Sequence, residues 1–110
     1  MEAVQKIEQV KHLPIKFGEV ARHYYVPGDP NRVPVIAESL ENVINQGQNR
    51  EFNAYKGTYK GIDVSVVSTG IGCPSTAIAV EELSHIGAEV FIRIGTSGSV
   101  DKSAKKGDIF

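Results

Sequence analysis

Two arginines stand beside turn-forming stretches of this sequence, and their positions predict that they bind an anion. Arg32 lies in "PGDPNR", where an Asp–Pro pair predicts the start of a helix with Asp29 as its N-cap. The first turn of a helix is already positive, so a cation there is unfavourable unless a negative group faces it. Arg93 interrupts the apolar run "VFIRIG", where an unpaired charge is costly. Phosphate suits both positions, because a guanidinium fork binds a tetrahedral oxyanion well.

Three segments rich in small or turn-forming residues follow strands that the sequence predicts. They are "PGDPNR", "STGIGCPST" and "RIGTSGS". In an open α/β sheet, ligands bind beyond the carboxyl ends of strands, where loop N–H groups and helix N-termini gather. The hydroxyl groups of Thr96 and Ser97 would add hydrogen bonds there. The sequence thus predicts a phosphate site built from three loops and two arginines.

Ordinary structural roles compete with this interpretation. Arg32 can be a solvated helix residue or a partner of Glu38 or Asp29, and Arg93 can be salt-bridged to a core carboxylate. The P-loop pattern GxxxxGK[ST] and the dinucleotide pattern GxGxxG do not occur in the sequence, which argues against those two phosphate-binding folds. The spacing of Cys, His and Asp residues does not suggest zinc.

Composition narrows the class of protein. A length of 110 residues allows one domain, and 41% apolar residues are enough for a modest core. The formal net charge of −1 argues against nucleic acid or an anionic membrane as the main partner. The sequence has no apolar run of membrane-spanning length, and charges interrupt its N-terminus. The single cysteine, Cys73, fits a reducing compartment, so we expect a cytoplasmic protein.

Strands alternate with helices along the chain, which predicts an α/β fold: a layered α/β/α arrangement with a central mixed, largely parallel sheet. A three–four apolar rhythm predicts a helix of about four turns over 30–44, and a second helix is expected from Pro74 to Ile86, ended by Gly87. The expected strands are 22–27, 50–56, two strands joined at Lys60–Gly61 of which the second is 62–67, and 88–95. Residues 108–110 have the character of a further strand's first residues, so we expect residues 1–110 to be the N-terminal portion of a single, longer domain.

Four motifs, in this order and spacing, resemble the nucleoside phosphorylase family: "VPGDPNRV", "NREF", "VVSTGIGCPSTAIAVEEL" and "FIRIGTSGSV". The resemblance covers residues 12–110 and is closest to the uridine phosphorylase branch, followed by purine nucleoside phosphorylases of the hexameric type. It implies reversible phosphorolysis of a nucleoside, with uridine expected first, to a free base and a pentose 1-phosphate. A purine or methylthioadenosine phosphorylase of the same fold is the alternative enzyme. A non-catalytic phosphate- or nucleoside-binding module is the alternative from another class.

The resemblance also implies a phosphate site. Its ligands would be the backbone N–H of Gly28 and the side chains of Arg32, Arg93 and Thr96. Arg93 and Thr96 would act in catalysis by holding phosphate against the positive charge that develops on the sugar. Arg50 of "NREF" would reach the phosphate of a neighbouring subunit. The groups that hold the base lie in the family's second half, so residues 1–110 alone are expected to be inactive.

Further roles follow from the same resemblance. His12 would contact the sugar across a dimer interface, and Thr96 would touch the same pentose. Glu51, Ile71 and Ser75 match positions that hold a monovalent cation, such as potassium, between subunits of some uridine phosphorylases. No cofactor is expected, because phosphate is itself a substrate. The implied partners are small molecules and further copies of the chain, assembled as dimers within a hexamer.

Overall fold

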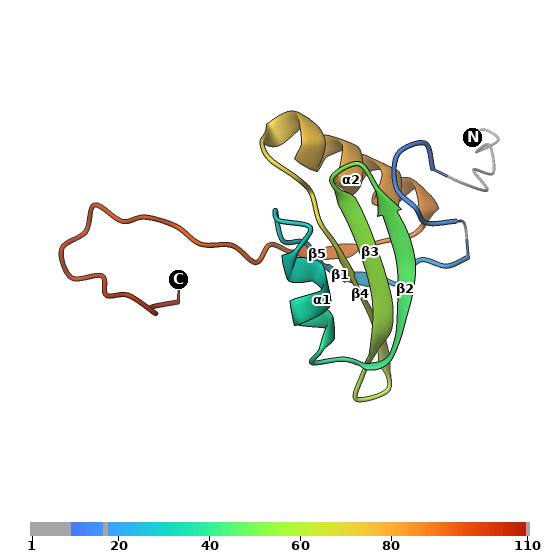
Figure 1. Cartoon of the computed structure of the whole chain (residues 1–110), viewed down its shortest axis with the longest axis horizontal. Coiled ribbons are helices and arrows are strands. Elements are labelled where there is room, and N and C mark those ends of the chain that lie inside the picture. Colours follow the sequence, from blue (N-terminus) through green and yellow to red (C-terminus); the bar gives the residue numbers. More distant parts are fainter. Residues whose placement is uncertain (1–9, 17, 110) are drawn as a thin grey trace.

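The computed structural model describes residues 10–16 and 18–109. These residues form five strands in one sheet, of order β2-β3-β4-β1-β5, and two helices (Figure 1). The elements are β1 (His23–Tyr25), α1 (Arg32–Ala37), β2 (Glu41–Asn49), β3 (Phe52–Tyr59), β4 (Ile62–Val67), α2 (Cys73–Ile86) and β5 (Val90–Ile92). The strand that we expected to begin at residue 108 is not formed at 108 and 109, and residue 110 lies outside the described residues.

The sheet is mixed, as predicted. β1 pairs in parallel with β4 on one side and with β5 on the other, so that His23 lies between Val64 and Val90. β3 pairs antiparallel with both β2 and β4, so the parallel pairs make up half of the sheet rather than most of it. The carboxyl ends of β4, β1 and β5 therefore meet at one edge of the sheet, and three loops leave from that edge.

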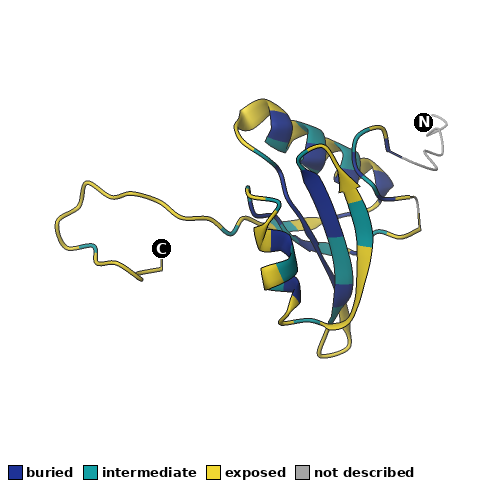
Figure 2. Cartoon of the chain, viewed as in Figure 1, coloured by how far each residue is buried: buried dark blue, intermediate teal, exposed yellow. Residues whose placement is uncertain are grey.

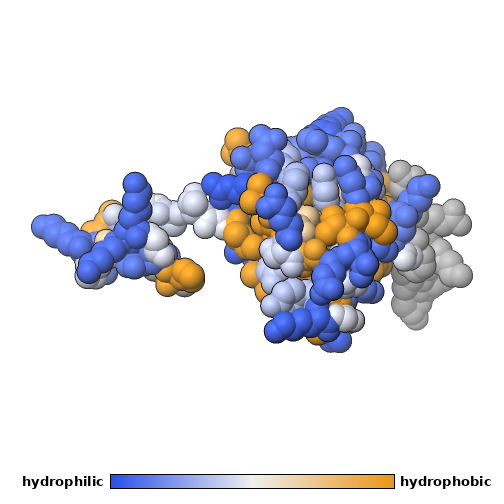
Figure 3. Space-filling view, turned by 60° about the horizontal axis from the view of Figure 1, so that its bottom comes forward, coloured by the Kyte–Doolittle hydropathy of each residue, from blue (hydrophilic) through white to orange (hydrophobic). Residues whose placement is uncertain are grey.

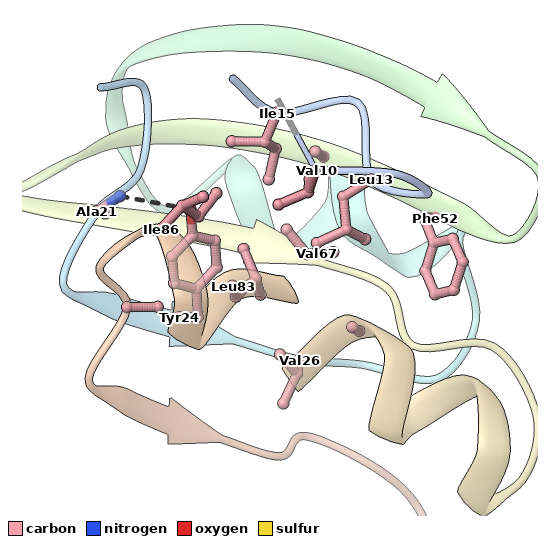
Figure 4. Packing of buried hydrophobic residues seen from close by; sticks show 13 residues of the cluster. Val10, Leu13, Ile15, Ala21, Tyr24, Val26, Phe52, Val67, Leu83 and Ile86 are labelled. Carbon is pink, nitrogen blue, oxygen red and sulfur yellow. Dashed lines mark hydrogen bonds between the residues drawn. The ribbon is translucent and has the colours of Figure 1, made fainter. Parts of the chain in front are cut away.

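The two helices cover opposite faces of the sheet, which confirms the layered α/β/α arrangement. Leu83 of α2 shares a buried cluster with Tyr24 of β1 and Val67 of β4 (Figure 4). Because successive strand residues point to opposite faces, Val66 and Gly57 face the other way. On that side α1 lies against β3 and β4 and buries Val33 and Ala37 (Figure 2).

The segment before β1 contributes to the core on the α2 side. Val10, Leu13 and Ile15 are almost fully buried and belong to the same cluster as Leu83. The hydroxyl of Tyr24 accepts a hydrogen bond from the N–H of Ala21, at 3.3 Å (Figure 4). Apolar burial, rather than regular secondary structure, thus holds this segment against the sheet.

α2 confirms the helix predicted over 74–86 to within one residue. Pro74 lies in its first turn, where a missing N–H costs nothing. Gly87 ends it with a φ of 121°, and the Gly87 N–H bonds to the carbonyl of Ser84. Local signals at both ends were therefore enough to find this helix.

The helix predicted over 30–44 is wrong beyond Ala37. α1 has six residues, and the chain from 41 to 49 is strand β2. Asn42 has a positive φ of 53°, which breaks a helix. Val43 and Ile44 are β-branched, and Ile44 pairs with Lys56 of β3. Pairing with a distant strand therefore overrides the local apolar rhythm.

The N-cap assignment also differs from the prediction. Asn31, not Asp29, precedes the first residue of α1, and it makes no side-chain capping bond. The carboxylate of Asp29 instead accepts the N–H of Asn31 at 2.9 Å, and the carbonyl of Asp29 accepts the N–H of Arg32 at 3.0 Å. Asp29 therefore shapes the turn that leads into the helix.

The hairpin at Lys60–Gly61 is confirmed. Both residues have positive φ, 51° and 82°, as a tight turn between antiparallel strands requires. The strand before it, β3, runs over 52–59, so the stretch 50–56 and the short strand before the turn are one element. β5 is shorter than the predicted 88–95 and ends at Ile92, before Arg93.

Two parts of the surface are unusually open. After β5 the chain leaves the sheet, and most of residues 93–109 are exposed (Figures 1 and 2). On the sheet face that carries α1, a hollow of about 180 Å³ is lined mainly by apolar surface. Its lining includes Tyr59, Ile62 and Ile92, each about half exposed. Figure 3 shows apolar side chains gathered on the exposed surface of the sheet domain. Neither helix is long and apolar enough to cross a membrane, within the residues that the structure describes.

Candidate anion-binding site

The loops after β1 and β4 are joined by backbone hydrogen bonds. The N–H of Thr69 donates to the carbonyl of Pro27 at 2.9 Å, and the N–H of Gly70 donates to the carbonyl of Gly28 at 3.0 Å. These contacts continue the pairing of β1 and β4 beyond the ends of both strands. The "PGDPNR" and "STGIGCPST" segments are therefore held side by side, as the sequence predicts.

Arg93 joins the third loop to the first. Its Nη1 donates to the carbonyls of Ile94, at 2.6 Å, and of Val26, at 3.5 Å. A Cβ added at Gly28 would lie 3.2 Å from Nη2, and one added at Gly95 would lie 2.9 Å from Nη1. The guanidinium thus lies between the backbones of two glycines, with its side chain exposed to solvent.

Neither arginine of the candidate site is neutralised by a carboxylate among the residues that the structure describes. Within residues 10–16 and 18–109, Arg93 has no acidic group at salt-bridge distance. In the same part of the chain, Arg32 pairs with neither Glu38 nor Asp29. The salt bridges weighed from the sequence are therefore not formed among the described residues, while Arg32 is exposed on α1, as expected of a solvated helix residue.

The other two predicted phosphate ligands of these loops, Arg32 and Thr96, do not take part in the contact between Gly28 and Arg93. Arg32 is exposed at the first residue of α1, on the loop that begins at Gly28. Thr96 is exposed in the segment that leaves the sheet, and among the described residues its side chain makes no hydrogen bond. Gly28 and Arg93 are thus brought together, Arg32 follows on the same loop, and Thr96 lies outside this contact.

A second group of predicted residues meets behind the Gly70 turn. The hydroxyl of Ser75, in the first turn of α2, donates to Glu51 Oε2 at 2.9 Å and contacts the carbonyl of Thr69. A Cβ added at Gly70 would lie 2.5 Å from Cγ of Glu51. Glu51 therefore packs against the second loop, whereas the Ile71 side chain is 98% exposed.

The groups around Glu51 shift the pKa of its carboxyl. The pKa of its carboxyl is below the ordinary value, chiefly because its own backbone N–H bonds to it and then because the Ser75 hydroxyl does. Desolvation opposes this, and the positive charge of Arg50 lowers the pKa slightly further. Arg50 lies in the exposed turn between β2 and β3, with a φ of 53°. Glu51 is thus bonded to Ser75 at the second loop, and Arg50 precedes it in the chain.

His12 is held by a carboxylate that the sequence did not single out. Glu82 of α2 accepts the backbone N–H groups of His12, at 2.9 Å, and of Leu13, at 3.1 Å, through Oε1. Its Oε2 lies 2.5 Å from Nδ1 of the His12 ring. Desolvation raises the pKa of Glu82, but these three hydrogen bonds outweigh it and hold the pKa below its ordinary value.

Sequence reasoning missed two positioning residues. Glu82 lies four residues from both Ile78 and Ile86, on the stripe of α2 that faces the core. A charged residue on that stripe is the signal that could have found it. Asn53 is buried in β3, and its Nδ2 donates to the carbonyl of Pro30 at 3.1 Å, which supports the first loop. Nothing in the local sequence marks Asn53 for this role.

The structure defines an α/β protein whose three loops leave one edge of a mixed sheet, and comparison with known proteins identifies its family. A family model described as the phosphorylase superfamily matches residues 22–110, so the chain belongs to that superfamily. The chain is 47% identical over 98 residues to a uridine phosphorylase of Thermococcus kodakarensis, covering 89% of this chain and 35% of that protein. It is 45% identical to a guanosine phosphorylase of Halorubrum lacusprofundi, covering 89% of this chain and 41% of the relative.

Solved structures show the same fold. A purine nucleoside phosphorylase from Toxoplasma gondii, in complex with immucillin-H, superposes with a TM-score of 0.88 and 38% identity. The match covers 94% of this chain and 42% of the other. The chain therefore spans between a third and a half of the length of the relatives that it matches.

Proposed function

We propose that this chain supplies the phosphate-binding part of a nucleoside phosphorylase, which converts a nucleoside and phosphate into a free base and a pentose 1-phosphate. The observation that carries the proposal is the guanidinium of Arg93, which lies against Gly28 without a carboxylate partner among the described residues. Phosphate would accept hydrogen bonds from Arg93, from Arg32 and from loop N–H groups such as that of Gly28. Thr96 joins this set if residues 93–109 fold back when ligand binds.

In this reaction the protein contributes mainly by binding the phosphate anion and by positioning it against the sugar. A phosphate oxygen forms a bond to the anomeric carbon of the sugar while the bond from that carbon to the base nitrogen breaks, and the base leaves with the electron pair. Positive charge develops on the sugar, and the bound phosphate dianion stabilises it. Arg93 and Arg32 hold that anion in place before the reaction begins, so part of the barrier is removed by positioning.

Uridine is the first substrate to test, because a 47%-identical relative is named uridine phosphorylase. The guanosine phosphorylase and purine nucleoside phosphorylase relatives make a purine nucleoside the second candidate. In the protein at its natural length, uracil release from uridine only when phosphate is present supports the proposal. Hypoxanthine or guanine release selects the purine alternative. Tight phosphate binding without turnover of any nucleoside contradicts the enzyme proposal and favours a binding module.

Assembly is part of the proposal. Arg50 lies in the exposed turn between β2 and β3, and His12 is bonded to Glu82 of α2, whereas the Arg93 guanidinium contacts Gly28 and Gly95. This placement supports the idea that Arg50 and His12 complete the site of a neighbouring subunit, in dimers within a hexamer. Sedimentation of the natural-length protein tests the assembly directly, and a stable monomer with full activity contradicts it.

A potassium ion at the subunit interface is the remaining proposal. Glu51 Oε2 and Ser75 Oγ offer oxygen atoms 2.9 Å apart, and oxygen is the ligand that hard cations prefer. Ile71 would contribute through its backbone. The ion would neutralise Glu51 between subunits and take no part in bond breaking. A higher melting temperature in potassium chloride than in tetramethylammonium chloride supports it, and equal temperatures contradict it.

A further inference from the structure

Glu82 makes three contacts with the segment around His12: two with backbone N–H groups and one with a side chain. Two are hydrogen bonds from backbone N–H groups, which anchor the chain at His12 and Leu13. The third joins Oε2 to Nδ1 of the His12 ring at 2.5 Å. His12 is 29% exposed and Glu82 15%, so solvent reaches the ring but hardly reaches the carboxylate.

The segment does not need the ring contact in order to stay folded. Leu13 is 2% exposed in the core, and Val10 and Ile15 are buried beside it. The carbonyl of His12 also accepts a hydrogen bond from Asn49 Nδ2 at 2.7 Å. Burial and backbone bonds therefore fix the main chain, and what the Oε2 contact adds is a fixed ring.

An ionised carboxylate only accepts hydrogen bonds, so its partner atom Nδ1 must carry a proton. A neutral imidazole with its proton on Nδ1 has a lone pair on Nε2, and that nitrogen accepts hydrogen bonds. The choice of tautomer therefore follows from Glu82. Buried carboxylates orient histidines in the same way at metal sites and in catalytic triads.

We propose that Glu82 is a positioning residue: it holds the His12 ring with its proton on Nδ1, so that Nε2 accepts a hydrogen bond from a hydroxyl of the nucleoside sugar. This inference rests on the proposed function, in which His12 completes the site of a neighbouring subunit, and on the sugar contact that the family resemblance implies for His12. It adds the residue that orients that contact and the direction of the hydrogen bond. Because Nε2 of His12 is a hydrogen-bond acceptor, it favours a ligand whose sugar carries a free hydroxyl as donor.

Glu82→Gln separates orientation from folding. The amide oxygen can still accept the two backbone N–H groups, while the amide NH₂ now faces Nδ1 as a donor. The His12 ring must then move its proton to Nε2, and it loses its acceptor there. Glu81→Gln is the matched control, because Glu81 is the adjacent exposed carboxylate and lies 3.9 Å from a different histidine, His85.

The first readout is the tautomer of His12, taken from ¹⁵N chemical shifts of histidine-labelled protein at a pH where the imidazole is neutral. We expect the proton on Nδ1 in the wild type and in Glu81→Gln, and on Nε2 in Glu82→Gln. An unchanged tautomer in folded Glu82→Gln overturns the proposal. This measurement needs no substrate, so it remains decisive if phosphorolysis itself is not found.

The second readout is steady-state kinetics of the protein at its natural length. We expect Glu82→Gln to raise KM for the nucleoside about tenfold, with KM for phosphate unchanged. Equal increases in both KM values overturn the proposal, because they indicate general loosening. A switched tautomer with an unchanged nucleoside KM overturns the sugar contact while phosphorolysis stands, and wild-type protein without turnover overturns the proposed function instead.

Discussion

Arg93 Nη2 lies 3.2 Å from the point where a side chain would begin at Gly28, although strand β1 and the end of β5 are far apart in the sequence. The contact exists because β1 and β5 are neighbouring parallel strands, whose ends fall at the same edge. A glycine at 28 leaves the guanidinium room beside the backbone N–H. The proposed phosphate site uses both donors, and the first two predictions test it.

Replacing Arg93 with alanine is expected to weaken phosphate binding without unfolding the chain. A charge-assisted contact contributes about 1.5–3 kcal/mol, or roughly ten- to hundredfold in affinity. Calorimetric titration with phosphate measures the change. Arg22→Ala is the matched control, since Arg22 is exposed and paired with Glu89, away from the loops. Unchanged affinity in folded Arg93→Ala would count against the phosphate site.

Gly95→Ala is expected to disturb the same site by displacement. Its Cβ would lie 2.9 Å from Arg93 Nη1, so the guanidinium has to move, and the end of a flexible side chain moves at little cost. We expect weaker phosphate binding, by roughly two- to tenfold, with an unchanged melting temperature. Gly98→Ala has nothing within 4 Å of the added Cβ and is the control. Equal affinities in the two variants would contradict this placement of the guanidinium.

Gly70→Ala is expected to destabilise the fold more than Gly61→Ala does. Both glycines have positive φ, 73° and 82°, so both substitutions carry a similar backbone strain of about 1–2 kcal/mol. At Gly70 the added Cβ also meets Glu51 Cγ at 2.5 Å and Ser75 Oγ at 2.8 Å, whereas Gly61 has open space. Overpacking should add ~1–3 kcal/mol, measured by urea unfolding. Equal losses in the two variants would contradict the contact between Glu51 and the second loop.

The two helices show what local sequence can and cannot determine. α2 was predicted because Pro74 and Gly87 mark its ends and its apolar residues repeat on one face. The stretch after α1 has the same rhythm, yet residues 41–49 form a strand, because β3 offers them a partner. No window of sequence contains that partner, so periodicity alone could not choose between the two states.

Part of the candidate site could likewise be predicted from the sequence, and part could not. The three loops were predictable, because small and turn-forming residues follow strand-like runs, and parallel strands bring such ends together. Glu82 was not predictable, because its partner His12 lies 70 residues away in the sequence and the contact depends on how α2 packs. Long-range side-chain pairs of this kind follow from tertiary packing, which a single sequence does not specify.

Acid should weaken the fold through Glu82. Its folded pKa is depressed below the ordinary value of 4.5, because the hydrogen bonds from His12 and Leu13 outweigh desolvation. The ionised form therefore contributes stability that is fully present above pH 4.5 and is lost as pH falls through the folded pKa. We expect the stability difference between wild type and Glu82→Gln to shrink over that range. Thermal unfolding at a series of pH values measures it, and a difference that does not change with pH would contradict the bonded carboxylate.

Donation across subunits makes a prediction about mixtures. Arg50→Ala and Arg93→Ala chains should each bind phosphate weakly as homo-oligomers. If Arg50 serves the neighbouring site, mixed dimers contain some sites with both arginines, and phosphate binding should partly recover. Mixed species isolated with two different affinity tags provide the measurement. No recovery in confirmed mixed dimers would contradict donation between subunits.

The two outer strands of the sheet differ in whether another strand can join them. β2 has register shifts between Glu41 and Ile44 and between Asn45 and Gly47, which interrupt a regular hydrogen-bonding row. β5 has three residues, regular parallel pairing with β1, and exposed Val90 and Ile92 beside the apolar hollow. Among the described strands, β5 therefore offers a regular edge for pairing, whereas the register of β2 is interrupted.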